Sequence, residues 1–254
     1  MSRNFELMER AGKEPRIGYS SGLPSHTVAS SSTGNGHRVG NGLDLDQITR
    51  DELLKLVQRV FGTQGRGHPC AIVIAGVDLG DGSSRICADI AKTLAMNVSE
   101  SVCLVDANVQ SNSLPRILDA TNFHGLVDSL RDEGAIRDFA QRLRPNNLWF
   151  LSSGTAGSDL ASHSRSDRLK TRLTELRTAF DYVLISVPPV FLDGTATLVG
   201  PLVDGAILVV EANLTHREVA RKARETLESA NVRLLGAVFN NRTFPIPGAL
   251  YARL

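Results

Sequence analysis

The segment from Ala71 to Ala95 constrains the fold more than any other part of the chain. It begins with an apolar run, Ala71 to Ala75, that has the length and the branched residues of a buried strand. A turn containing three glycines follows, and apolar residues then recur at helical spacing. Glycines let backbone N–H groups approach an anion, and a helix N-terminus adds the positive end of its dipole. The segment therefore predicts a phosphate-binding loop between a strand and a helix.

The side chains of this turn depart from the usual phosphate-loop pattern. That pattern is G-x-x-x-x-G-K-[ST], and the stretch from Val77 to Ser84 keeps its second glycine, Gly82, and its final hydroxyl. Val77 takes the place of the first glycine, and Ser83 takes the place of the lysine that normally reaches the β- and γ-phosphates. The sequence predicts the shape of a phosphate loop without its principal charge.

Apolar segments of strand length alternate with amphipathic helical patterns along the rest of the chain. Nearly all residues of each predicted strand are apolar, which is typical of a parallel sheet covered on both faces. The sequence therefore predicts an α/β fold with a doubly wound, mainly parallel sheet and helices in two outer layers. Further strands are expected at 102–106, 147–154, 181–190, 206–210 and 232–239, and helices at 49–62, 114–118, 126–130, 136–143, 160–180, 195–202 and 217–229.

The chain of 254 residues, of which 42% are hydrophobic, is long enough for one α/β domain and an appendage. Residues 1–17 show a short helical pattern with Phe5 and Met8 on one side, which suits either a docking peptide or a frayed terminus. Residues 18–42 are rich in Ser, Gly, His, Thr and Asn, so we expect a flexible linker there. Residues 43–254 form the predicted domain, and the first helix has Thr49 as its expected N-cap.

Charge and cysteine content restrict the partners and the compartment. A formal net charge of +1 gives no reason to expect a nucleic-acid partner. Three cysteines without metal-ligand spacing are typical of reduced thiols in a reducing compartment. No apolar stretch reaches the roughly 20 residues of a membrane span, and the first residues are too polar for a secretory signal. We therefore expect a cytoplasmic protein.

The glycine spacing alone leaves a second interpretation open. The pattern Gly76-x-x-x-Gly80-x-Gly82 also fits short-chain dehydrogenases, in which Asp106 at the end of the second strand would hold a ribose hydroxyl. Those enzymes need a catalytic Tyr-x-x-x-Lys. The tyrosines of this chain are Tyr19, Tyr182 and Tyr251, and none has a lysine four residues later. The enzyme is therefore excluded, and only a dinucleotide-binding module remains of this interpretation.

Several motifs in the expected order resemble the bacterial tyrosine kinases of capsule and exopolysaccharide synthesis, which are relatives of the chromosome-partitioning and division-site ATPases. The resemblance covers about Thr49 to Arg242. The segment RLKTRLTELRTAFDYVLISVPPV is similar to the one that ends in F-D-x-V-I-I-D-T-P-P-V in that family. SVCLVDANVQSNSLPRIL resembles the motif I-D-A-D-x-R, and GDGSS takes the place of G-E-G-K-S. DGAILVVEANLTHREVARKARETLESANVRLLGAVFN is similar to the D-G-x-x-L-V-V and L-G-x-V-x-N region.

The resemblance implies an ATP and Mg²⁺ site and assigns residues to it. The first acid of the second motif falls on Asp106, the candidate catalytic and Mg²⁺-binding residue, and its second acid falls on Asn108. The later, Walker B acid falls on Ser186, and the lysine falls on Ser83. Ser84 is the candidate hydroxyl ligand of Mg²⁺. The candidate nucleotide-binding residues are Gly80, Asp81, Gly82, Ser83, Ser84 and Asn240.

These departures imply that ATP and Mg²⁺ are bound weakly or not at all, and that the chain is a regulatory, kinase-like protein. Of the family's tyrosine-rich acceptor tail, only Tyr251 remains. The family also implies a membrane-bound chain-length regulator as partner, and a homo-oligomeric ring built through E-x-x-R-x-x-R, here Glu52, Lys55 and Gln58. The alternatives are an active ATP-dependent kinase with an atypical loop, a glycine turn kept only for tight packing, and Asp106 as a helix cap.

Overall fold

A central, mainly parallel β-sheet organises the chain in the computed structural model, which describes residues 45–62, 70–80, 82–154 and 167–241. Within these residues the sheet has seven strands in the order β3-β4-β2-β5-β1-β6-β7. All neighbours pair in parallel except β3, which runs antiparallel to β4. The strands are β1 (Ala71–Gly76), β2 (Val102–Asp106), β3 (Gln141–Arg142), β4 (Leu148–Leu151), β5 (Tyr182–Val187), β6 (Gly205–Glu211) and β7 (Leu234–Asn240).

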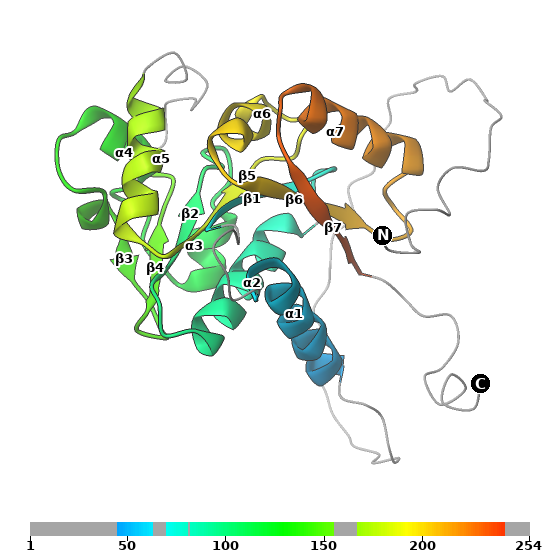
Figure 1. Cartoon of the computed structure of the whole chain (residues 1–254), viewed down its shortest axis with the longest axis horizontal. Helices are drawn as coiled ribbons and strands as arrows, with labels where there is room; N and C mark the ends of the chain where they lie inside the picture. Colours follow the sequence, from blue (N-terminus) through cyan, green and yellow to red (C-terminus); the bar gives the residue numbers. More distant parts are fainter. Residues whose placement is uncertain (1–44, 63–69, 81, 155–166, 242–254) are drawn as a thin grey trace, which may run out of the picture. The chain divides into compact units, whose positions relative to one another are not determined.

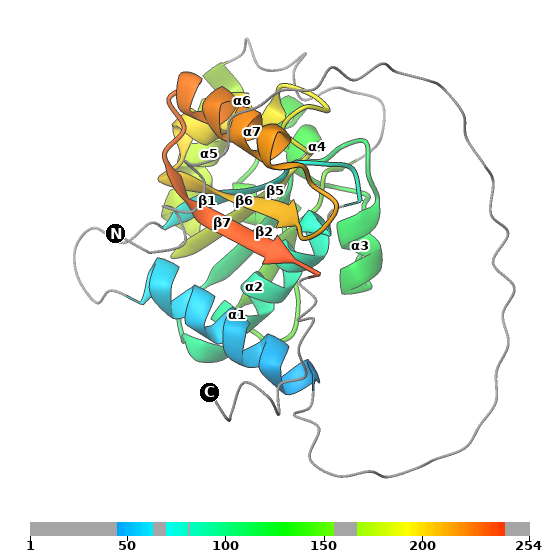
Figure 2. The same cartoon turned by 90° about the vertical axis from the view of Figure 1, so that its right-hand side faces the viewer.

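Helices cover both faces of this sheet (Figure 1). One face carries α1 (Leu45–Phe61), α2 (Ser83–Asn97) and α3 (Ser113–Leu118), whose buried side chains share one apolar cluster. The other face carries α4 (Leu126–Arg131), α5 (Asp167–Ala179), α6 (Thr195–Val199) and α7 (Arg217–Ser229), and the short 3₁₀ helices η2 (Ile136–Phe139) and η4 (Gly200–Leu202) extend this layer. The view in Figure 2 shows the same two layers edge-on.

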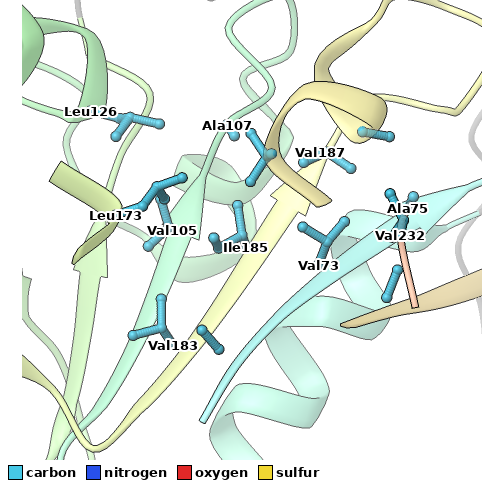
Figure 3. Close-up of a cluster of buried hydrophobic side chains, with 14 of the residues drawn as sticks. Val73, Ala75, Val105, Ala107, Leu126, Leu173, Val183, Ile185, Val187 and Val232 are labelled. Atoms are coloured by element: carbon cyan, nitrogen blue, oxygen red, sulfur yellow. The ribbon is translucent and has the colours of Figure 1, made fainter. Parts of the chain in front are cut away.

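The alternation of side chains along each strand builds the two cores. Ile72 and Ile74 of β1 pack toward α1 and α2, whereas Val73 and Ala75 point to the opposite face. Figure 3 shows the second set meeting side chains from neighbouring strands and helices, Val105 and Leu173 among them. Each large side chain buried in this way contributes about 1.5–3 kcal/mol, so both faces of the sheet stabilise the domain.

The predicted fold is confirmed, including the central position of the strand that begins at Ala71, which pairs with β5 and β6. Two helix predictions were wrong in detail. Helix α1 begins at Leu45, so Thr49 lies inside it and is not its N-cap. The helix expected over 136–143 stops at Phe139 as 3₁₀ helix, because Gln141 and Arg142 pair with β4 instead. Tertiary pairing at the sheet edge outweighs the helical spacing of the apolar residues there.

Strand order decides against the dinucleotide-binding alternative. In dinucleotide-binding folds the first two strands are neighbours, whereas here β5 lies between β1 and β2. The carboxyl ends of β5, β1 and β6 consequently lie together at one end of the sheet, where the loops that follow β5 and β6 are hydrogen-bonded to the end of β1 and to the glycine turn after it. Predictions for residues 1–44, and for the tail after Asn241, lie outside the described residues. Among the described residues, no helix combines the length and apolar character needed to cross a membrane.

Candidate functional site

The turn between β1 and α2 has the backbone of a ligand-binding loop. Gly80 and Gly82 adopt positive φ angles of 85° and 74°, a region that glycine enters without steric cost. A Cβ atom built on Gly80 would have no atom within 4 Å, so the backbone there borders open space. A Cβ atom on Gly82 would lie 2.5 Å from Asn240 Nδ2. Both glycines are therefore required by the local conformation, and the second also leaves room for the end of β7.

This contact brings together two residues that the sequence assigned to nucleotide binding. Gly82 immediately precedes α2, and Asn240 is the last residue of β7. Ser83 and Ser84 form the start of α2, where Ser83 is buried and Ser84 is half-buried. Asp81 lies outside the described residues. The structure thus brings Gly82 and Asn240 together across 158 residues of sequence, and Ser83 stands in a buried place at the helix N-terminus.

Asp106 is a buried carboxylate at the end of β2, with only 2% of its surface exposed. Its Oδ1 accepts a hydrogen bond from Asn108 N at 3.0 Å, whereas its Oδ2 has no partner among the described residues. Burial raises the pKa of this carboxyl to about 7, although the hydrogen bond from Asn108 opposes the rise. Burial also raises the pKa of the Cys87 thiol on α2, and the charge of Asp106 adds to that rise.

Asp106 does not cap a helix, so that alternative is wrong. Helix α3 begins at Ser113 with Asn112 as its N-cap, and the carboxylate of Asp106 instead bonds the backbone two residues ahead of it. This geometry is a local turn closed by an aspartate side chain. The side chain consequently stays at the carboxyl edge of the sheet, beside β5.

Ser186 of β5 stands opposite Asp106 in the register of these two strands. Its backbone oxygen accepts a hydrogen bond from Ala107 N at 2.8 Å, but its buried Oγ has no partner among the described residues. The buried Oδ1 of Asn108 likewise has no hydrogen-bond partner among the described residues. Leaving a buried polar atom without a partner costs about 1–3 kcal/mol. Three such oxygens in one small region indicate a place for water or a ligand rather than a packed core.

A hydrogen-bonded pair that sequence reasoning missed connects two loops around the site. Thr215 Oγ1, after β6, donates to Asp78 Oδ2 in the glycine turn at 2.7 Å and accepts from Glu211 N at 3.2 Å. The two partners are 137 residues apart in the chain. An aspartate two residues after an apolar strand was a visible signal, but its partner depends on β6 lying beside β1. The pair fixes the glycine turn against the next loop.

The charges of the site fit a phosphate poorly. The described parts of the loops after β1, β5 and β6 (residues 77–80 and 82, 188–194, and 212–216) contain Asp78 and Asp193 but neither lysine nor arginine. Within the described ranges, no three His, Cys, Asp or Glu side chains are grouped so that they could hold a metal ion. The turn therefore has the positive-φ glycines of a phosphate loop, whereas the described parts of the three loops contain carboxylates and neither lysine nor arginine.

Comparison with known proteins gives the family. The family model of the cellulose biosynthesis protein BcsQ matches residues 70–236. The chain belongs to this family. Among curated relatives of this BcsQ-family chain is the tyrosine-protein kinase YwqD of Bacillus subtilis (strain 168), 27% identical over 172 residues, which cover 68% of this chain and 72% of YwqD. The tyrosine-protein kinase CpsD of Streptococcus agalactiae is 24% identical over 170 residues, covering 66% of this chain and 74% of CpsD.

Solved structures place the BcsQ-family chain in the same fold group. The chimerical protein CapA2B2 superposes with a TM-score of 0.71 at 21% identity, covering 76% of this chain and 85% of that one. A ParA family ATPase from Chlorobium tepidum TLS gives a TM-score of 0.54 at 15% identity, covering 68% of this chain and 86% of that one. The resemblance to bacterial tyrosine kinases and their P-loop ATPase relatives is therefore confirmed.

Proposed function

We propose that this chain is a regulatory, kinase-like protein of exopolysaccharide synthesis whose nucleotide site no longer supports phosphoryl transfer. The observation that carries the proposal is the buried Asp106 facing a neutral Ser186, in a site whose described loops contain no cation. Membership of a cellulose biosynthesis family supports the process, and the named kinase relatives support the ancestry of the site.

The missing charges explain why catalysis is the property we infer to be lost. A charge-assisted hydrogen bond contributes about 1.5–3 kcal/mol. Replacing the loop lysine by Ser83 should therefore weaken phosphate binding by roughly 10- to 100-fold. Phosphoryl transfer depends almost entirely on positioning and on neutralising charge. The rate of transfer should consequently fall further than the affinity for ATP.

An active, ATP-dependent tyrosine kinase with an atypical loop is the second candidate. It is favoured by the positive φ angles of Gly80 and Gly82, which keep the cradle open, and by the retained carboxylate of Asp106. In that case Ser84 and Asp106 would hold Mg²⁺, and backbone N–H groups would have to replace the lysine. The two candidates differ in whether a cation restored at position 83 increases affinity.

A calorimetric series can separate them. Ser83→Lys should strengthen ATP binding roughly tenfold or more, and adding Ser186→Asp should make that binding depend more strongly on Mg²⁺. Asp106→Ala in the double variant should then remove most of the Mg²⁺-dependent gain. Ser99→Lys is the matched control, because it adds the same charge at an exposed position in the turn after α2. If Ser83→Lys binds ATP no better than Ser99→Lys does, the lost-lysine explanation fails.

The partner we propose is the cytosolic end of a membrane-bound chain-length regulator of polysaccharide export. The proposal rests on the family resemblance. Loss of this chain from cells should then change the amount or the length of the polymer, and the protein should co-purify with the regulator from membranes. An unchanged polymer in the deletion strain would count against this partner.

The proposed ring would form through the exposed side of α1. Lys55 Nζ and Glu52 Oε1 form an ion pair of 2.8 Å on that exposed surface, within one helix. Such a pair contributes little to stability, so both side chains can exchange partners when a second subunit binds. Light scattering should show an assembly that Glu52→Ala dissociates, and a monomer at all concentrations would argue against the ring.

A further inference from the structure

Four large apolar side chains are exposed around the glycine turn, and we call them the apolar rim. They are Leu79 (75% exposed), Leu214 (70%), Phe191 (50%) and Leu192 (40%). They come from the loops that follow β1, β6 and β5, three strands that are neighbours in the sheet. Exposed apolar side chains gathered in one place mark an interaction surface more often than isolated ones do.

Hydrogen bonds hold the three loops of the rim together. Thr215 Oγ1 donates to Asp78 Oδ2 at 2.7 Å, which places Leu214 and Leu79 in adjoining loops. Val190 N, next to Phe191, donates to Gly76 O at 2.9 Å. The rim is therefore one surface that is fixed in the folded chain. Whatever covers it gains apolar contacts without having to order these loops.

The charges of this surface indicate what could cover it. Asp78 and Asp193 lie in the rim loops, Glu211 ends β6, and the described parts of these loops contain no lysine or arginine. An acidic, apolar surface suits a segment that is itself basic and apolar. Opposite charges guide the approach of such a segment, and apolar contact holds it.

The chain itself leaves the sheet at this surface. The arrowheads of β6 and β7 lie on the same side of the sheet (Figure 2). At the end of β7, Phe239 is 56% exposed and Asn240 lies against Gly82. Asn241 then adopts a left-handed conformation (φ 54°), and its Nδ2 donates to Glu211 Oε1 at 2.8 Å. The described part of the chain therefore ends beside the loop that carries Leu214, where Asn241 is hydrogen-bonded to the last residue of β6.

Residues 242–254 are both basic and apolar, so their composition complements the acidic, apolar rim. Their sequence, RTFPIPGALYARL, contains two arginines and no acidic residue, so its side chains carry a formal charge of +2. The large apolar residues of the segment are Phe244, Ile246, Leu250, Tyr251 and Leu254. Thirteen extended residues reach about 40 Å, which suffices to cross the rim loops. A short tether also gives an effective concentration on the order of millimolar.

We propose that residues 242–254 bind the apolar rim of the same molecule. The proposal goes beyond the proposed function, because it requires neither nucleotide chemistry nor its loss. A partner of this protein would gain access to the rim by displacing the segment.

Trypsin cleavage of the full-length protein tests the proposal, because the segment has a cleavage site after Arg242. We expect Leu79→Ser/Leu214→Ser to speed this cleavage roughly tenfold, since cleavage follows the population of the undocked segment. Phe244→Ser/Leu250→Ser should do the same from the other side of the contact. Met96→Ser is the matched control, because Met96 is 68% exposed near the end of α2, away from the rim. Cleavage after Arg38 in the same sample serves as the internal standard.

Each outcome decides for or against the proposal. Faster cleavage in both double variants, with Met96→Ser unchanged and equal melting temperatures, supports it. Equal rates in wild type and in both double variants overturn it. Protection that fades over a roughly hundredfold dilution shows that a second copy covers the rim, because contact within one molecule does not depend on concentration. Protection seen only after adding the membrane regulator assigns the rim to that partner. No nucleotide is present, so failure here leaves the proposed function untouched.

Discussion

The carboxyl group of Asp106 opposes folding at neutral pH. Its pKa is about 7 in the folded chain, because burial disfavours the charged form, against an ordinary value of 3.8. A folded-state pKa that is raised in this way contributes stability below about pH 4, and that contribution is lost as the pH rises toward 7. Binding sites commonly retain residues that cost stability, so this cost agrees with the place of Asp106 in the candidate site.

Asp106→Asn should therefore stabilise the protein in a pH-dependent way. The substitution keeps the shape and removes the charge, so the variant should match wild type near pH 4 and exceed it by about 2–4 kcal/mol at pH 8. Urea unfolding at the two pH values measures the difference. Asp119→Asn is the control, because this exposed residue already has a positive φ that asparagine tolerates. An Asp106→Asn effect of the same size at both pH values would contradict the burial argument.

Asp204 predicts the opposite pH dependence at the other end of the sheet. Its Oδ2 accepts hydrogen bonds from Ala71 N and Cys70 N, and its Oδ1 accepts one from Arg177 Nη2 at 2.7 Å. Burial alone would raise the pKa of Asp204, but these donors hold it below its usual value. A lowered pKa gives stability above the unfolded-state pKa that is lost as the pH falls. Asp204→Asn should cost about 1–2 kcal/mol at pH 7 and less at pH 3, where the carboxyl group begins to be protonated. Urea unfolding at the two pH values measures the difference, and an equal cost at both values would refute this.

Sequence could predict the position of Asp106 but not its surroundings. The aspartate follows an apolar run, so its place at the end of a strand was visible. That Ser186 faces it depends on β5 lying between β1 and β2, an order that no local pattern encodes. The Asp78–Thr215 hydrogen bond was missed for the same reason, because it joins loops from neighbouring strands. Residues that meet through strand order stay hidden until the order is known.

At the scale of elements, α5 binds backbone carbonyl groups at the end of α4 and in the turn that follows it. The guanidinium of Arg172, on a side chain only 10% exposed, donates to Ser129 O, Asp132 O and Gly134 O at 2.7–2.8 Å. Arg168 Nη1 donates to Leu130 O at 2.8 Å. The last carbonyls of a helix need partners from outside that helix. The packing of α4 therefore depends on α5, which starts 36 residues after α4 ends.

Arg172→Met should destabilise the domain by about 2–4 kcal/mol, because it leaves several carbonyls without donors. Arg172→Lys should recover only part of the loss, since a single ammonium group cannot reproduce the planar fork. Lys170→Met, an exposed change on the same helix, is the control. Thermal unfolding measures all three proteins, and a loss no greater than that of Lys170→Met would show that the guanidinium contacts carry little stability.

At the scale of the whole molecule, the α/β fold followed from the alternation of apolar strands and amphipathic helices. The prediction of a helix over 136–143 was wrong for its last residues, because Gln141 and Arg142 pair with β4 at the edge of the sheet. The sequence pattern does not reveal this pairing. The resemblance to bacterial tyrosine kinases followed from several motifs in order, and the family and fold comparisons confirm it. The positions that lack the charged residues of the kinase family, the acidic loops and the apolar rim all lie at the carboxyl ends of the central strands. We infer that this end of the sheet now serves regulation rather than phosphoryl transfer.

A calorimetric titration of the wild-type protein with ATP, with and without Mg²⁺, tests whether the nucleotide site has lost its function. We expect a dissociation constant on the order of millimolar or no measurable binding, with little change on adding Mg²⁺ and no tyrosine phosphorylation in the same samples. Asp106→Ala should bind no more weakly than wild type. Micromolar binding that requires Mg²⁺ and is abolished by Asp106→Ala would show that the nucleotide site is functional and that the proposed loss is wrong.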